Sequence, residues 1–209
     1  GLARDFGWLT EEQRQGELTR LLAELLARPR LGVGDVDLAC SLEREHGLQQ
    51  GQVLSATTAH RDLPHEALRA CLGSSEARAK TLQALTTGSA AELVYVQAML
   101  RHRPMNDPAE QRSLAAAIAQ LPTPTAQVRA LDALAKQRVS DPHSLKAIAG
   151  LFTTTRSLQV QRAIANVLLR ADTQSLERGD LLRSLRRYRL KSPEGQDVID
   201  ALIRVLQRA

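Results

Sequence analysis

Aromatic residues are almost missing from this sequence. They make up 2% of its 209 residues, as Phe6, Trp8, Tyr95, Phe152 and Tyr188. Apolar and β-branched residues that alternate with polar ones, the pattern of a half-buried strand, are missing too. Alanine and leucine, which both favour helices, dominate the 43% of residues that are hydrophobic. The sequence therefore predicts an all-α protein with an aliphatic core.

Cysteine is scarce as well, with two residues in the chain. Cys40 and Cys71 are too few for a disulfide framework, and their spacing fits no metal site. Each lies in an apolar helical stretch, so we expect buried thiols that pack as small hydrophobic side chains. A disulfide between them is the less favoured alternative.

Long apolar runs are also lacking. No stretch approaches the roughly 18 residues that a membrane-spanning helix needs, so we expect no membrane span. The chain begins at Gly1 without a charged-then-apolar leader, and its two methionines are Met99 and Met105. We therefore expect a processed or engineered N-terminus. The sequence predicts neither a cellular location nor an oligomeric state.

Motifs for catalysis and cofactor binding are missing. The sequence has no glycine-rich phosphate loop, no dinucleotide-binding glycine pattern and no nucleophile elbow. Its histidines are scattered without the spacing of metal ligands: His46, His60, His65, His102 and His143. We therefore expect no metal, no cofactor and no enzymatic activity.

Helical periodicity and helix-ending residues divide most of the chain into short helices. Leu18, Leu22 and Leu25 share one face of a helix predicted over residues 10–28, which Pro29 ends. Serine, glycine or proline bounds the helices that follow. We expect these over residues 35–46, 49–60, 63–72, 74–86 and 89–103, and about 11–12 helices in the whole chain.

A repeat of about 34 residues organises the chain after residue 107. Asp107-Pro108 and Asp141-Pro142 each place an N-cap acceptor before a proline at the first helical position. The same interval separates three leucines of the second helices: Leu134, Leu168 and Leu202. The last of these helices is expected over residues 193–208. Stacked helix pairs with this period are typical of solenoids.

Two second-helix segments carry a family resemblance. Residues 127–134 and 160–168 each have a valine and an arginine before an alanine- and leucine-rich stripe, and they resemble the second helix of HEAT repeats. The resemblance covers residues 61–209. It implies a right-handed superhelical stack of antiparallel helix pairs, a HEAT-like α-solenoid whose second helices line a concave face. Residues 1–60 match no repeat, so we expect an N-terminal helical cap or module there, separate or part of the same domain.

Positive charge gathers in the C-terminal part of the chain. The net charge is +5, but residues 1–60 carry −3 and residues 61–209 carry +8. Arginine outnumbers lysine 24 to 4, which suits carboxylate and phosphate partners, although a GC-rich coding sequence produces the same bias. In the densest run we expect Tyr188 to face the core and four side chains to form an exposed basic ridge: Arg183, Arg186, Arg187 and Lys191.

These features support two functional hypotheses. The first is a non-catalytic protein-protein interaction scaffold, an adaptor domain of a larger protein. It would hold a protein or peptide on the concave face through Arg129, Asp132, Lys136, Arg162, Asn166 and Asp200. The alternative is nucleic-acid or polyanion binding through the basic C-terminal repeats and their ridge. The interpretation favoured for this ridge is a solvated last helical turn, whose cations stabilise the C-terminus of the helix.

Overall fold

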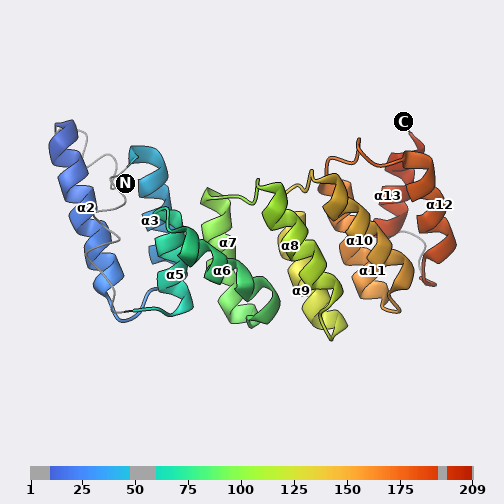
Figure 1. Ribbon diagram of the computed structural model, residues 1–209, viewed down its shortest axis with the longest axis horizontal. Helices are drawn as coiled ribbons and strands as arrows, with labels where there is room; N and C mark the ends of the chain where they lie inside the picture. Colours follow the sequence, from blue (N-terminus) through green and yellow to red (C-terminus); the bar gives the residue numbers. More distant parts are fainter. Residues whose placement is uncertain (1–9, 48–59, 193–196, 209) are drawn as a thin grey trace. The chain divides into compact units, whose positions relative to one another are not determined.

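The computed structural model describes residues 10–47, 60–192 and 197–208. Within these residues the regular structure is entirely helical, with eleven α-helices and no strand (Figure 1). The predicted all-α class is therefore confirmed. The helix predicted over residues 49–60 lies, apart from His60, outside the described residues.

The helices belong to two compact units, residues 1–104 and 105–209. The first unit contains α2 (Glu11–Ala27), α3 (Val33–His46), α5 (Leu63–Cys71), α6 (Ser75–Thr87) and α7 (Ala90–His102). The second contains α8 (Pro108–Ala119), α9 (Pro124–Ala135), α10 (Pro142–Thr154), α11 (Leu158–Arg170), α12 (Arg178–Tyr188) and α13 (Val198–Gln207). Residue 60, where we placed a boundary, lies inside the first unit, and α3 packs there against α5 and α7. The cap role of residues 1–60 stays a prediction.

Most helices begin where the sequence supplies a capping side chain. Thr10 and Gln13 cap α2 reciprocally: the Thr10 N–H donates to the side-chain oxygen of Gln13 at 3.0 Å, and the Gln13 N–H donates to the hydroxyl of Thr10 at 3.2 Å. Asp107 accepts from the N–H of Ala109, and Asp141 accepts from that of Ser144. Both Asp-Pro steps therefore start helices, as predicted.

The core of the first unit is built from leucines. One face of α2 buries Leu18, Leu22, Leu25 and Leu26 completely or nearly so. These side chains pack in one cluster with residues of α3 and α5 or their flanks: Leu31, Ala39, Leu42, Leu68 and Leu72. At about 1.5 to 3 kcal/mol for each fully buried leucine, this cluster is the main stabilising feature of the unit.

A disulfide joins α3 to α5. Cys40 and Cys71 are bonded to each other, with Cα atoms 5.1 Å apart and both side chains buried. The prediction of two packed thiols was therefore wrong in its chemistry, although the burial was correct. Helical periodicity places each cysteine on a core-facing side but does not show that the two faces meet, so the pairing required the tertiary structure.

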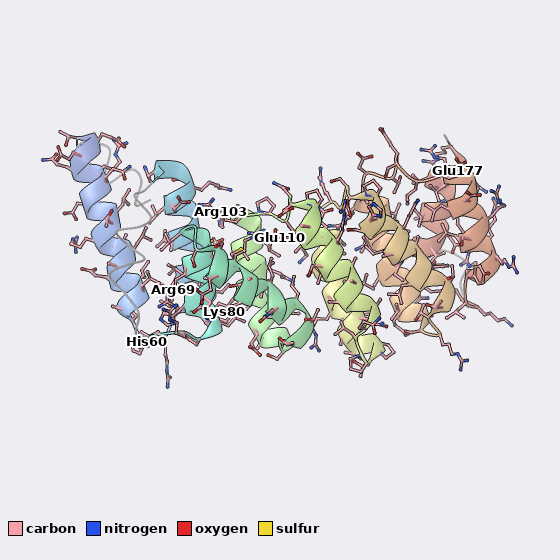
Figure 2. The ribbon with its side chains drawn as sticks, in the orientation of Figure 1. His60, Arg69, Lys80, Arg103, Glu110 and Glu177 are labelled. Atoms are coloured by element: carbon pink, nitrogen blue, oxygen red, sulfur yellow. A yellow bond between two sulfur atoms is a disulfide. The ribbon has the colours of Figure 1, made fainter. Side chains whose placement is uncertain are left out.

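A buried carboxylate in the same unit is neutralised from the end of α7. Glu43 on α3 is 4% exposed, and Arg103, which directly follows α7, donates to it at 2.6 Å. The same guanidinium donates to the carbonyl of Cys71 at 2.9 Å, so it connects α3 to the C-terminus of α5. Figure 2 labels Arg103 at this position. Burial of a charge is tolerable here because it is paired and hydrogen-bonded.

The helices of the second unit form two layers, one of first helices and one of second helices of the pairs. The first helices of the pairs contact one another in the order α8, α10, α12, and the second helices in the order α9, α11, α13. Leu134, Leu168 and Leu202 occupy the same buried position on the three second helices. The 34-residue register predicted from these leucines therefore marks equivalent core positions.

The last helix departs from that register at its start. We expected it to begin at residue 193, but α13 begins at Val198, with Asp197 as its N-cap. Asp200 therefore lies in the first turn of α13, whereas Asp132 and Asn166 each lie eight residues after the start of their helix, α9 or α11. The register is kept at the core leucines, but Asp200 is at a helix start and the other two are not.

Candidate partner-binding surface

The outward face of α9 and α11 carries four of the six residues predicted to bind a partner. On α9 the buried positions are Ala130, Leu131, Ala133, Leu134 and Ala135. The residues between and beside them point away from the core, so Asp132 and Lys136 are exposed and Arg129 is half-buried. On α11 the half-buried Asn166 follows Asp132 at the interval of 34. Since α9 packs against α11, these polar residues lie on neighbouring helices.

Asp132 lies in a partly desolvated environment on this face. Burial of its carboxyl raises the pKa of Asp132, and the ammonium of Lys136 one turn later acts in the opposite direction. A carboxylate that is already partly dehydrated loses less solvation when a partner covers it.

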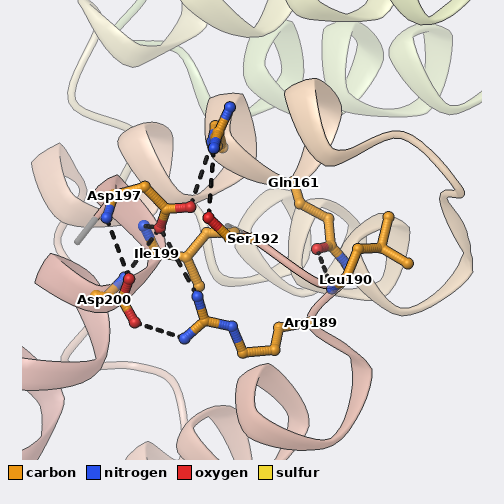
Figure 3. A network of polar contacts seen from close by, with 8 residues as sticks. Gln161, Arg189, Leu190, Ser192, Asp197, Ile199 and Asp200 are labelled. Atoms are coloured by element: carbon orange, nitrogen blue, oxygen red, sulfur yellow. Dashed lines mark hydrogen bonds and ion pairs between the residues drawn. The ribbon is translucent and has the colours of Figure 1, made fainter. Parts of the chain in front are cut away.

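Arg162 and Asp200, in contrast, belong to one polar network, of which Figure 3 labels Asp200, Asp197 and Arg189. Arg162 donates to the carboxylate of Asp197 at 3.3 Å and reaches the hydroxyl of Ser192 at 3.5 Å. Asp200 accepts from Arg189 at 2.5 Å and from the N–H of Asp197 at 3.1 Å. Hydrogen bonding to Arg189 lowers the pKa of Asp200. The network holds the start of α13 against α11.

A buried glutamine completes the same connection. Gln161 is fully buried, and its amide donates to the carbonyls of Phe152 and Tyr188 at 3.1 and 2.9 Å. Its side-chain oxygen accepts from the N–H of Leu190 at 2.8 Å. One side chain thus satisfies backbone groups at the ends of two helices, α10 and α12.

The six predicted residues therefore have two structural situations. Arg129, Asp132, Lys136 and Asn166 lie on the outward face of α9 and α11. Arg162 and Asp200 connect α11 to the α12–α13 segment, and their charges are already paired. The alignment of Asp132, Asn166 and Asp200 at intervals of 34 residues did not reveal this difference. It compares positions in the sequence and takes no account of where each helix begins.

The predicted basic ridge spans α12 and the residues after it. Arg183 is paired with Asp180, and the guanidinium of Arg187 lies 5.3 Å from the ring centre of Tyr188. Arg186 and Lys191 are exposed. Because α12 ends at Tyr188, Lys191 lies beyond the helix and not in line with Arg183 and Arg187. Tyr188 is 41% exposed, so the prediction that it faces the core was wrong. Leu181 and Leu185 fill that core face.

A basic pocket at the ends of α9 and α11 was not predicted. It has a volume of about 310 Å³ and is lined by Ala135, Lys136, Arg138, Leu169 and Arg170. Lys136 and Arg170 are 34 residues apart, so the repeat could have indicated that these two cations lie at equivalent ends of neighbouring helices. Arg138 has a φ of 51°, a left-handed conformation that the sequence pattern gives no reason to expect at an arginine.

The described part of the chain contains no group of three or more histidine, cysteine, aspartate or glutamate side chains placed to hold a metal ion. None of the helices in those ranges is long and apolar enough to cross a membrane.

Comparisons with known proteins give no family for this chain. Protein-family models, curated proteins and solved structures all returned no significant match.

Proposed function

We propose that this chain is a non-catalytic interaction scaffold, a HEAT-like α-solenoid that holds a protein or peptide along its second helices. The proposal is supported above all by the row of outward polar residues Arg129, Asp132, Lys136 and Asn166 on two helices that pack side by side. Side chains of both charges and an amide, spaced one helical turn or one helix apart, suit a polar peptide backbone and its side chains.

Arg162 and Asp200 have a positioning role in this proposal. The pair of Arg162 with Asp197 fixes the start of α13 relative to α11, and the pair of Asp200 with Arg189 fixes it relative to the end of α12. Their substitution would disturb the fold together with any binding, so they are unsuitable as probes of a partner. The surface is better tested at Asp132 and Asn166.

The test uses the purified chain and a displayed library of random peptides. We expect the wild-type chain to select peptides. Their affinity should fall at least about tenfold, or by about 1.4 kcal/mol, in the variant Asp132→Arg plus Asn166→Arg. A control variant places two arginines on exposed positions of the first helices, Ser113→Arg plus Ala147→Arg. Circular dichroism establishes that both variants remain folded. Selection of no peptide, or equal weakening by both variants, would overturn the proposal.

A second candidate function is nucleic-acid binding at the basic ridge of α12. It is favoured by the exposed ring of Tyr188 beside Arg187, in a hollow that Arg183 and Arg186 also line. An exposed aromatic ring with neighbouring arginines is a suitable stacking platform for a base of a single strand.

Oligonucleotide titrations across salt concentration test this second candidate. Phosphate contacts would make the logarithm of the binding constant fall linearly with the logarithm of salt. The variant Arg186→Glu plus Tyr188→Ala should lose that binding, whereas Lys146→Glu on α10 should keep it. Absence of binding at low salt, or a response without salt dependence, would contradict it.

A further inference from the structure

The basic pocket at the C-terminal ends of α9 and α11 has the shape and charge of an anion site. Lys136 follows the last residue of α9, and Arg170 is the last residue of α11. Arg138 comes from the turn that leaves α9. We propose that this pocket binds the phosphate group of a phosphorylated side chain in a peptide partner; this inference rests on the proposed scaffold function.

One backbone hydrogen bond and one buried side chain hold the two turns that carry the cations. The N–H of Asp172, after α11, donates to the carbonyl of Val139, after α9, at 3.0 Å. The side chain of Val139 is fully buried, so the turn that carries Arg138 is anchored to the core. Both turns are therefore held next to each other, and the pocket between them is present before any ligand arrives.

The charge of the pocket suits a dianion. Its lining has three cationic side chains and no acidic one. The C-terminal ends of two helices contribute about half a negative charge each, and Lys136 also acts on the Asp132 carboxylate, but Arg138 and Arg170 keep the pocket positive. A phosphate monoester carries about −1.5 to −2 at neutral pH, whereas a carboxylate carries one negative charge. The phosphate is therefore attracted to this pocket more strongly than a carboxylate is.

Two of the cations are available for such a ligand. Within the described residues, the side chains of Arg138 and Arg170 make no hydrogen bond or ion pair, and both are exposed. A planar guanidinium can donate two parallel hydrogen bonds to phosphate oxygens. The nearest acidic neighbour after α11, Asp172, accepts instead from the backbone N–H of Gln174 at 3.2 Å.

The backbone at Arg138 supports a ligand role. A left-handed conformation is unfavourable for an ordinary side chain, whereas glycine adopts it without that cost. Here an arginine occupies it and lines the pocket. Arginine at a position that favours glycine is consistent with a requirement for the guanidinium itself.

The first experiment measures the side-chain N–H signals of the arginines by NMR in the intact chain. Inorganic phosphate and phosphoserine are the probes, with acetate for comparison. We expect saturable shifts of the Arg138 and Arg170 signals with both phosphates, and much weaker ones with acetate. Arg204, which lies 34 residues after Arg170 but lines no described pocket, serves as the internal control. No shift with phosphate, or the same shift with acetate, would overturn the inference.

The second experiment uses paired peptide arrays in which every sequence is present with serine and with phosphoserine. The wild-type chain should prefer phosphorylated members by about tenfold, a difference of about 1.4 kcal/mol. The variant Arg138→Gly plus Arg170→Gln should lose that preference and keep its binding of unphosphorylated peptides. The matched variant Arg204→Gln should keep both.

The outcomes separate the pocket from the scaffold function. Peptide binding without any phosphate preference overturns the pocket alone. No peptide binding in either form overturns the scaffold proposal as well. If single-stranded oligonucleotides bind and the Arg138 and Arg170 substitutions remove that binding, the pocket serves nucleic-acid phosphates and the phosphopeptide assignment is overturned.

Discussion

Arg112 on α8 holds the carboxylate of Asp141, the N-cap of α10, with three hydrogen bonds of 2.9 to 3.1 Å. The carboxylate is almost fully buried, and it also accepts from the N–H and hydroxyl of Ser144. One acidic group thereby begins a helix and connects consecutive first helices of the second unit.

The stability of the second unit should depend on the ionisation of Asp141. The Arg112 guanidinium holds the pKa of Asp141 well below its usual range, with Ser144 adding to the effect. A group with a depressed pKa in the folded state stabilises the fold above its unfolded pKa, near 3.9, and loses that contribution as the pH falls further. We expect chemical denaturation to show Asp141→Asn less stable than wild type at pH 7 and a smaller difference at pH 3. A difference that is the same at both pH values would contradict this. Asparagine keeps one N-cap acceptor but not both carboxylate oxygens, so the change of the difference with pH, and not its size at pH 7, reports the ionisation of Asp141.

The disulfide between Cys40 and Cys71 should be a large part of the stability of the first unit. Its cysteines are 31 positions apart, and closing a loop of that length in the unfolded chain is worth about 3 to 4 kcal/mol. Cys40→Ala plus Cys71→Ala should therefore lower the free energy of unfolding by about that amount in urea titrations of the oxidised protein.

Reduced wild-type protein is the control for that prediction, and its free energy of unfolding should be close to that of the double variant. A thiol-reactive chromophore should find no free thiol in oxidised chain that has been unfolded in urea. Detection of two thiols would show that the bond does not form under those conditions, and the stability difference should then vanish.

The helices of this chain could be predicted from local features, because the residues that begin and end them act within one turn. Thr10 with Gln13, and Asp141 before Pro142, cap helices through neighbours in sequence. The core leucines of the repeat follow from periodicity for the same reason. The predicted bounds of α2, α6 and α7 accordingly agree with the structure within a residue.

Most of the features that sequence reasoning missed depend on contacts between distant residues. The bond between Cys40 and Cys71 requires α3 to lie against α5. The pairing of Arg162 with Asp197 depends on where α13 begins, which an aligned row of residues does not reveal. The pocket at Arg138 depends on a left-handed turn that a non-glycine residue seldom adopts. Sequence analysis therefore found the surface residues but not which of them are already paired.

Two glycines offer a matched test of local packing. Gly16, exposed within α2, has open space where a Cβ atom would lie, and alanine should raise the stability by about 0.5 to 1 kcal/mol. At Gly88, after α6, a Cβ atom would lie 2.6 Å from the carbonyl oxygen of Ala84. Gly88→Ala should lower the stability by about 1 to 3 kcal/mol. Thermal denaturation of both variants is the measurement, and effects of the same sign would show that one of the two environments is described wrongly.

The buried amide of Gln161 should be the most sensitive polar position of the second unit. Gln161→Leu conserves the volume but leaves the N–H of Leu190 and the carbonyls of Phe152 and Tyr188 without this partner. At about 1 kcal/mol or more for each of these three groups, a loss of about 3 kcal/mol or more is expected. Gln127 occupies the equivalent place 34 residues earlier, is half-buried and makes one such bond, to the carbonyl of Ile118 at 3.2 Å. Gln127→Leu should therefore cost about 1 kcal/mol. Urea denaturation compares the two, and equal losses would mean that the bonds to Tyr188 and Leu190 contribute nothing to holding α12 in place.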